Sequence, residues 1–387
     1  MNWLFLSPEF PPNYHLFAWH LRQRGGLSVG IGVPPFSELP PHVAQSLVRY
    51  AGVGDLHHTE AVVATARTLA HEIGPFAGVD SFNEHWLPLE ATLREALDIP
   101  GPRPSDLPAF QHKSEMKAYF AKAGLTPIPG RVAQDFADVA AFVDEHGLPI
   151  IAKPDKGVGA QATLRIATLE ELRQFQTTFR PGYLLERFIT GTIQTYDGLV
   201  DSEGRILFAA SLEYSRGVAE VVSQDTDIFY FVQREIPADL REVGPRIVQA
   251  YQLRARFFHF EFIRSTTGQL YPLEVNMRPP GYPTLDLFNF AHDIDLYEVW
   301  ATMVLGQPVP ALPAPAYYAC YIARKNTIGY EHDHEAVLRR LGDRLLYHGP
   351  TNPLFRAAMG DYHYVIRTPD FSEMVELATY TQKRLTL

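Results

Sequence analysis

Two aromatic-rich runs joined by a short polar segment constrain this chain more than any other feature. The runs carry, at alternate positions, Glu261 in the first and Glu274, Asn276 and Arg278 in the second. Both runs are typical of β-strands, and the polar residues 264–269 between them are typical of a hairpin turn. Because alternate residues of a strand point to the same face, the pattern predicts a hairpin that gathers these four side chains on one face.

Three oxygen ligands and one guanidinium on a single face suit Mg²⁺ and phosphate. Magnesium prefers a few carboxylates together with phosphate oxygens over a cage made entirely by the protein. A single strand glutamate would ordinarily face solvent, but phenylalanines flank both acids, among them Phe260 and Phe262. The flanking rings predict burial, and a buried carboxylate needs a cation or another partner.

Composition narrows the class of protein. The chain has 387 residues, enough for two to three domains. A net charge of −10 argues against nucleic acid or an anionic membrane as the main partner. No apolar run approaches the roughly 18 residues of a membrane span, and Met1 to Pro8 is typical of a first strand, not of a signal peptide. Cys320 is the one cysteine, which fits a reducing, cytoplasmic location.

Two proline-rich segments divide the chain into three predicted domains. Strand and helix patterns alternate over residues 1–108, which predicts an α/β domain with a largely parallel sheet. In this part residues 42–50 have a helical pattern. Residues 109–310 predict an α+β unit with mostly antiparallel strands, and residues 311–387 a small α/β tail. The glycines of residues 25–32 end a helix and lie within a strand, so they do not form a dinucleotide fingerprint, which argues against a Rossmann oxidoreductase.

Further candidate residues lie in the middle of the chain. Lys153 ends a predicted strand, and Gly157 and Gly159 in the following loop would let backbone N–H groups approach an anion. The loop lacks the Gly-Lys-Ser/Thr of a Walker A motif, and a plain β-turn also explains it. Lys113, in the first turn of a helix, is a second candidate cation, although an isolated lysine there would ordinarily be solvated.

The order of these parts resembles the ATP-grasp superfamily, in particular carboxylate–amine ligases related to carbamoyl-phosphate synthase and biotin carboxylase. The resemblance rests on Lys113, then Lys153 with its glycine loop, then Glu186 to Ile189, then Glu261, then Glu274 to Arg278. It implies an N-terminal Rossmann-like (pre-ATP-grasp) domain over 1–108 and a central ATP-grasp fold over 109–310. The central fold would divide into a lid at about 109–185 and a metal-binding part at about 186–310, followed by a small C-terminal domain, 311–387.

The resemblance also implies roles for individual residues. Lys113 and Lys153 would contact the phosphates of ATP, with Gly157 and Gly159 in a flap over them. The adenine would be held mainly by backbone groups of Glu186, Arg187, Phe188 and Ile189. Two Mg²⁺ ions, with Mn²⁺ as an alternative, would be held by Glu261, Glu274 and Asn276, and Arg278 would stabilise an acyl phosphate or the tetrahedral intermediate.

The implied activity is ATP- and Mg²⁺-dependent joining of a small-molecule carboxylate to an amine, with release of ADP and phosphate. Two alternatives stay open: activation of bicarbonate, and a regulator that binds ATP without turnover. The chain departs from the family pattern at Ile193, where relatives usually carry a glutamate that binds ribose, and the neighbouring Gln194 is expected to face the opposite side. A homodimer is a further expectation from the family.

Overall fold

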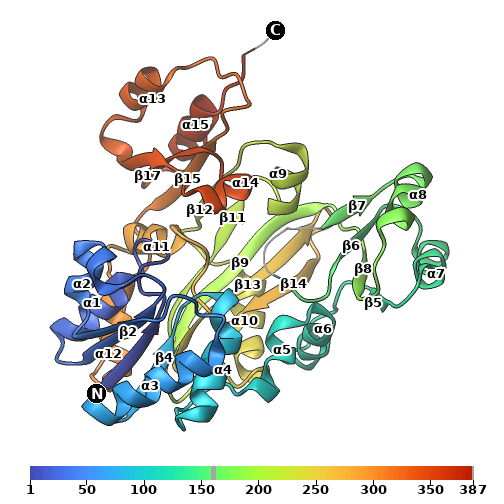
Figure 1. The fold of residues 1–387 in the computed structure, drawn as a ribbon. Coiled ribbons are helices and arrows are strands. Elements are labelled where there is room, and N and C mark those ends of the chain that lie inside the picture. The colour runs from blue at the N-terminus through green and yellow to red at the C-terminus, as the bar shows by residue number, and fades with distance from the viewer. Residues whose placement is uncertain (158–162, 386–387) are drawn as a thin grey trace.

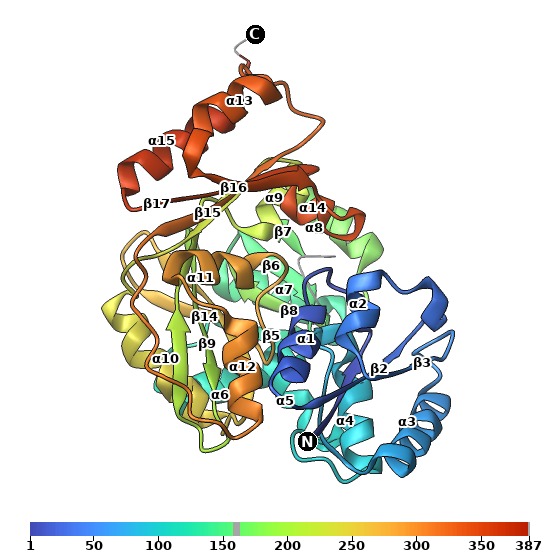
Figure 2. The same ribbon diagram turned by 90° about the vertical axis from the view of Figure 1, so that its left-hand side faces the viewer.

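The computed structural model describes residues 1–157 and 163–385, and Gly159 therefore lies outside the described residues. These described residues build a nine-stranded sheet and two four-stranded sheets, with helices packed around them (Figures 1 and 2). No helix among the described residues combines the length and the apolar character that a membrane span requires.

The N-terminal residues form an α/β unit around a parallel sheet. Its strand order is β3-β2-β1-β4, and its members are β1 (Asn2–Leu6), β2 (Leu27–Gly32), β3 (Arg49–Gly52) and β4 (Phe76–Asp80). The helices are α1 (His15–Gln23), α2 (Pro41–Ser46), α3 (Thr59–Ile73) and α4 (Leu87–Ala96). The helix predicted over 42–50 is wrong in its second half, because the extended backbone at Leu47 ends α2 and the next residues pair with β2 as a strand.

A second four-stranded sheet, here named the lid sheet, lies where the sequence predicts a lid, and the lid role stays a prediction. Its order is β5-β8-β6-β7, with antiparallel pairs between β5 (Gly130–Ala133), β8 (Tyr183–Arg187), β6 (Ile150–Pro154) and β7 (Leu164–Ile166). The helices α7 (Phe136–His146) and α8 (Leu169–Thr178) belong to this part, and Figure 1 shows them at the far edge of the molecule. Helices α5 (Pro108–Gln111) and α6 (Lys113–Lys122) precede it.

The nine-stranded sheet is antiparallel and contains the strands of the central and C-terminal parts of the chain that follow the lid sheet. Its order is β14-β13-β9-β11-β12-β15-β17-β16, with β10 paired to β9. The strands are β9 (Gly191–Val200), β10 (Ile206–Ala210), β11 (Leu212–Tyr214), β12 (Phe229–Val232), β13 (Arg256–Ser265), β14 (Leu270–Asn276), β15 (Tyr318–Arg324), β16 (Leu345–Pro350) and β17 (Tyr362–Thr368). Its helices are α9 (Val218–Gln224), α10 (Ala238–Ala250), α11 (Thr284–His292), α12 (Leu296–Val304), α13 (His334–Leu341), α14 (Arg356–Met359) and α15 (Phe371–Thr381).

The sheet continues across the second proline-rich segment. Strand β12, which precedes that segment, pairs with β15, which follows it. The C-terminal strands therefore extend the central sheet and do not form a sheet of their own. The domain boundaries predicted from the linkers stay predictions.

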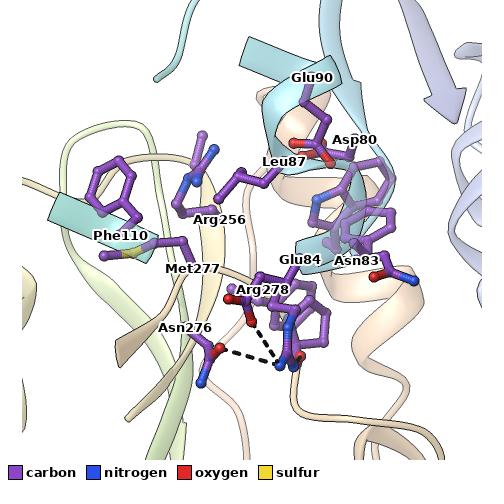
Figure 3. A pocket seen from close by; sticks show the side chains of 15 residues that line it. Asp80, Asn83, Glu84, Leu87, Glu90, Phe110, Arg256, Asn276, Met277 and Arg278 are labelled. Atoms are coloured by element: carbon purple, nitrogen blue, oxygen red, sulfur yellow. Dashed lines mark hydrogen bonds and ion pairs between the residues drawn. The ribbon is translucent and has the colours of Figure 1, made fainter. Parts of the chain in front are cut away.

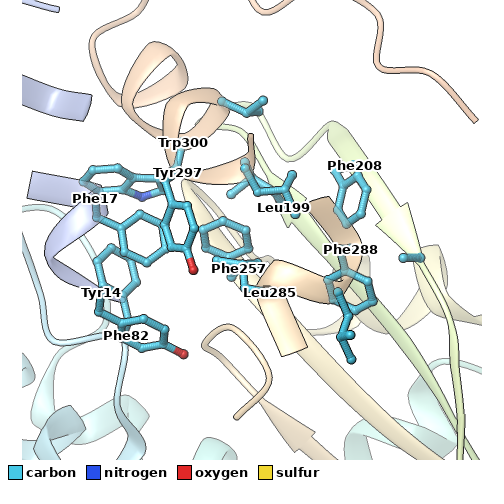
Figure 4. Close-up of a cluster of buried hydrophobic side chains, with 14 of the residues drawn as sticks. Tyr14, Phe17, Phe82, Leu199, Phe208, Phe257, Leu285, Phe288, Tyr297 and Trp300 are labelled. Atoms are coloured by element: carbon cyan, nitrogen blue, oxygen red, sulfur yellow. The ribbon is translucent and has the colours of Figure 1, made fainter. Parts of the chain in front are cut away.

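One hydrophobic core joins the N-terminal unit to the central part (Figure 4). Phe17 of α1 stacks on Phe82 with ring centroids 3.8 Å apart and meets Trp300 of α12 edge to face at 5.2 Å. Phe257 of β13 also contacts Phe17, at 5.7 Å. Because a close-packed apolar core resists sliding, this contact fixes the carboxyl ends of β1 and β4 relative to the β13–β14 hairpin.

Candidate active site

The predicted hairpin is present and brings its acids face to face. Strands β13 and β14 pair so that Glu261 lies opposite Glu274 and His259 lies opposite Asn276. Directly opposed and alternate residues share one face of a sheet, so the two carboxylates and the amide lie together. Arg278 lies just beyond the end of β14, and its guanidinium Nη2 donates to Asn276 Oδ1 at 3.2 Å.

Burial and neighbouring charges shift the pKa values of Glu274 and Glu261 in opposite directions. Burial raises the pKa of Glu274; the charge of Lys113 opposes this effect, and the charges of Glu261 and Glu84 add to it. Burial also acts to raise the pKa of Glu261, but His259, through its hydrogen bond and charge, together with the charges of Arg278 and Lys113, outweighs burial and lowers the pKa. Two opposed carboxylates of this kind repel each other unless a cation lies between them.

Metal ligation at this hairpin would need more than carboxylates. Within residues 1–157 and 163–385, no group of three or more His, Cys, Asp or Glu side chains is arranged to hold a metal ion. The candidate set has two carboxylates and the buried amide of Asn276, a donor set of oxygens that fits Mg²⁺ completed by phosphate oxygens and water.

The buried side chain of His259 forms a hydrogen bond with Glu261. His259 Nε2 lies 3.0 Å from Glu261 Oε1, and His259 Nδ1 lies 2.6 Å from Asp197 Oδ1 on β9. Thr195 donates to the same aspartate. Burial alone would lower the pKa of His259, but the charges and hydrogen bonds of Asp197 and Glu261 raise it to about 9. This arrangement fixes the orientation of Glu261, as outer partners of metal ligands commonly do.

The raised pKa of His259 predicts a pH-dependent stability in metal-free protein. The pKa is about 9 in the folded chain and about 6.5 in an unfolded one. Because the folded value is higher, the protonated ring contributes its full stabilisation below about pH 6.5 and loses it as the pH rises through about 9. We expect urea unfolding in EDTA to give a free energy of unfolding that falls across this window, and to fall less in His259→Gln.

The matched control for this experiment is His71→Gln, which changes an exposed histidine of α3. It should keep the pH dependence of the wild type. Equal slopes for His259→Gln and the wild type would show that the ring is not protonated in the folded chain.

The predicted phosphate-binding lysines are both buried, and Lys113 contacts the hairpin. Asp155 caps α6 by accepting from the backbone N–H of Ser114 at 2.7 Å, which directs the first residue of that helix inward. Lys113 Nζ lies 3.2 Å from Glu274 Oε1 and donates to the carbonyl oxygen of Gly157 at 2.9 Å. Lys153, near the end of β6, pairs instead with Glu186 at 2.6 Å.

The side chain of Glu186 forms ion pairs that the sequence did not predict. It is buried between Lys153 and Lys117, and Lys117 also donates to the carbonyl oxygen of Ile128 at 2.8 Å. Burial acts to raise the pKa of Glu186, but the two lysines outweigh it and lower the pKa. Lys117 is one helical turn after Lys113 on α6, a spacing that places both on one face.

The segment after β8 connects the lid sheet to β9. Arg187 donates through Nη2 to the hydroxyl of Tyr271 at 3.3 Å, and the guanidinium of Arg165 lies 4.7 Å from the ring centre of Phe188. Phe188 and Ile189 are half-buried. The role of this segment as an adenine hinge stays a prediction.

The departure at the predicted ribose position has a structural counterpart. Gln194 points away from the face of Glu261: its amide oxygen accepts from Arg264 Nε at 2.8 Å and its amide nitrogen donates to Glu213 at 2.8 Å. Ile193 pairs with Ile263, two residues after Glu261 on the same face. An aliphatic side chain thus stands where the family pattern has a carboxylate.

Arg278 bridges the hairpin to the N-terminal unit. Its Nη2 atom lies 3.3 Å from Glu84 Oε2, and the Glu84 side chain is 11% exposed. Glu84 opens a short 3₁₀ turn, residues 84–86, that follows β4. Glu84, Arg278 and Asn276 line a small cavity of about 20 Å³, and Figure 3 shows these side chains. This volume is space for about one water molecule.

The other charged groups around this cavity neutralise one another. Arg94 lies 3.0 Å from Glu90 and 3.4 Å from Asp80. Asp80 also accepts from Trp3 Nε1 at 3.0 Å. Burial and the charge of Glu90 raise the pKa of Asp80 to about 7, and burial together with Arg94 lowers the pKa of Arg256 to about 10. We interpret this set as a structural network between α4 and β13.

Comparison with known sequences gives distant relatives. No protein-family model matches the chain. It is 25% identical over 345 residues to the uncharacterized protein y4rH of Sinorhizobium fredii, covering 83% of this chain and 68% of that protein. It is 24% identical over 238 residues to the L-arginine-specific L-amino acid ligase of Bacillus subtilis, covering 59% of this chain and 57% of the ligase. The chain thus spans little more than half of that enzyme.

Comparison with solved structures covers nearly the whole chain. The L-amino acid ligase of Bacillus licheniformis superposes with a TM-score of 0.73 at 16% identity, over 97% of this chain and 95% of that one. The N5-carboxyaminoimidazole synthetase of Staphylococcus aureus, complexed with ADP, gives 0.73 at 16% identity, over 98% and 96%. The chain has an ATP-grasp fold. The ATP-grasp biotin carboxylase domain of Hydrogenobacter thermophilus 2-oxoglutarate carboxylase, solved with MgADP and bicarbonate, gives 0.66 at 17% identity, over 95% and 86%.

Three residues beside the candidate site of this ATP-grasp fold were not singled out from the sequence. Lys117 had a detectable signal, because it follows Lys113 by one helical turn. His259 also had one, because it precedes Glu261 by two residues and so shares its face of the strand. Glu84 had none in its spacing, because only the packing of the N-terminal unit brings it to Arg278.

Proposed function

We propose that this chain is an ATP- and Mg²⁺-dependent ligase that joins a carboxylate to an amine through an acyl phosphate, releasing ADP and phosphate. One observation carries the proposal: the opposed pair Glu261 and Glu274, with Asn276 beside them, faces the buried Lys113. The distant relatives named as amino acid ligases and the structures solved with ADP or MgADP support the same reading.

The ion pairs of the two lysines indicate how the residues would act. Lys113 pairs with Glu274 and Lys153 with Glu186, so each proposed phosphate-binding cation is matched with an acid. Bound Mg²⁺ would supply charge neutralisation of the transferring phosphoryl group. Glu261, Glu274 and Asn276 would hold the metal, which frees Lys113 to contact a phosphate oxygen.

Arg278 would act on the activated carboxylate. Its guanidinium is fixed at the end of β14 by Asn276 Oδ1 and the carbonyl oxygen of Pro279, at 3.2 and 2.9 Å. A guanidinium at this position would stabilise charge that develops on an acyl oxygen or a leaving phosphate. A guanidinium also offers paired donors that match phosphate geometry.

ADP release tests the proposal. Purified protein is incubated with MgATP and panels of carboxylates, amines and bicarbonate, and ADP is measured in a coupled assay. The expected result is ADP release that requires a carboxylate and an amine together, with the amide detected by mass spectrometry. ADP release that depends on bicarbonate would favour the carboxylase alternative, and nucleotide binding without ADP release under every combination would favour the regulator.

A further inference from the structure

We propose that Glu84 is the residue that binds the amine substrate, as an ammonium, beside the acyl phosphate. The proposal rests on the proposed ligase function and adds to it a residue of the N-terminal unit that the sequence did not indicate. Four features of the structure carry it: the position of Glu84, its burial, its single cationic partner and the size of the adjoining cavity.

Position comes first. Glu84 follows β4, and β4 pairs in parallel with β1. Ligands of open α/β sheets bind outside the carboxyl ends of the strands, and this is the edge that the aromatic core fixes against the β13–β14 hairpin. Glu84 therefore lies on the side of Arg278 that belongs to the N-terminal unit, whereas the lysines lie on the lid side.

Charge balance is the second step. Across residues 1–157 and 163–385, Arg278 is the sole cation within ion-pair distance of Glu84. The other two acids at the cavity, Asp80 and Glu90, already have Arg94. When Arg278 turns to an acyl phosphate, Glu84 is left as a nearly buried carboxylate without a counter-ion, an arrangement that is unfavourable in proteins. An arriving ammonium group restores the balance.

Size gives a further constraint. The cavity lined by Glu84, Asn276 and Arg278 has about 20 Å³, enough for about one water molecule. An ammonium group is of similar size, so it can reach the carboxylate while the rest of the amine stays outside. The exchange of partners also predicts an order: the amine binds well only after the carboxylate has been activated.

Amide formation at this site conserves atoms and charge. The ammonium gives one proton to the Glu84 carboxylate, and the freed nitrogen lone pair forms the C–N bond at the acyl carbon. The C–O bond to phosphate breaks, and the phosphate leaves with that electron pair. The second nitrogen proton passes to the departing phosphate, and Glu84 returns its proton to solvent. The products are the amide, hydrogen phosphate and one released proton.

Two acceptors separate amine binding from activation. Hydroxylamine is small and mostly uncharged at neutral pH, so it traps an acyl phosphate as a hydroxamate without needing a counter-ion. In Glu84→Gln we expect amide formation with the ammonium-type acceptor to fall about 10- to 100-fold, through a raised KM for the amine, as for loss of a hydrogen bond to a charged group. Hydroxamate formation should fall far less.

Matched variants complete the experiment. Glu95→Gln makes the same change at an exposed position of α4 and should leave both activities at wild-type levels. Glu84→Asp keeps the charge and should restore part of the amide formation. It also provides a second variant if Glu84→Gln does not fold, as judged by its melting temperature with MgADP.

The outcomes are distinct. Parallel loss of hydroxamate and amide in Glu84→Gln would mean that Glu84 acts only through Arg278 in activation, and no change in either would mean that it has no part; both overturn this inference alone. A wild-type protein that forms neither hydroxamate nor amide with any carboxylate would overturn the proposed ligase function, and this inference with it.

Discussion

Replacing Glu274 with glutamine is expected to abolish ADP formation while leaving the folded chain almost as stable as the wild type. Glu274 lies opposite Glu261 and 3.2 Å from Lys113. Its negative charge therefore acts on both groups proposed to contact the phosphates, the metal ion and Lys113. Glutamine fills the same space but cannot neutralise a divalent ion. Charge stabilisation by a metal is worth several kcal/mol, so turnover should fall by about a thousandfold or more.

Stability should respond differently from turnover. Burial and the neighbouring acids already disfavour the charged form of Glu274, as its raised pKa records. A neutral side chain of the same shape removes that unfavourable charge and also the partner of Lys113, and we expect the two effects nearly to cancel. The melting temperature without nucleotide should change by less than about 3 °C.

The matched control is Glu115→Gln, an exposed glutamate on α6, two residues after Lys113. It should keep wild-type turnover and melting temperature. Wild-type ADP formation in Glu274→Gln would refute the metal assignment, and a large loss of melting temperature would show that the carboxylate has a structural role instead.

Local pattern predicted the hairpin because its signals are local. Strand alternation, the aromatic flanks and the polar turn act within about twenty residues, and the register that they imply is set by the same alternation. The structure has the turn between β13 and β14, with Glu261 opposite Glu274. Lys113 and Lys153 were found in the same way, from a helix start and a strand end.

Tertiary packing decided what the sequence could not. The pairing of Lys153 and Lys117 with Glu186 joins residues on separate elements, and no periodicity relates them. The contact between Glu84 and Arg278 depends on an aromatic core shared by α1, α12 and β13. The first two residues of β3, Arg49 and Tyr50, were predicted as the end of a helix, because a short edge strand takes its conformation from pairing with β2, which outweighs local preference.

Replacing Arg278 is expected to separate activity from nucleotide binding. In Arg278→Lys the charge stays, but the paired donors of the guanidinium are lost. Loss of one fixed donor to a developing oxyanion lowers kcat by about 10²- to 10³-fold, and we expect a fall of this size in amide formation. The affinity for MgADP, measured by calorimetry, should change little, because Arg278 contacts Asn276 and Glu84 and neither of the lysines proposed to bind phosphate.

Removing the positive charge of Arg278 altogether tests its ion pair with Glu84 through protein stability. Arg278→Gln leaves Glu84 nearly buried without its cation, which should cost about 1–3 kcal/mol of the free energy of unfolding. Adding Glu84→Gln removes the uncompensated charge, so the double variant should regain most of that loss. Since directly paired residues are not additive, urea unfolding of the four proteins in this cycle measures the coupling.

The same cycle tests whether the ion pair between Arg278 and Glu84 contributes to the stability of the folded chain. Arg67→Lys, at an exposed position of α3, serves as the control for arginine replacement and should change neither stability nor kcat. If the two replacements at Arg278 and Glu84 proved additive in stability, the ion pair would contribute nothing to the unliganded chain. The exchange of partners that brings an ammonium to Glu84 would then lose its driving force, because no contact would have to be replaced when Arg278 turned to the acyl phosphate.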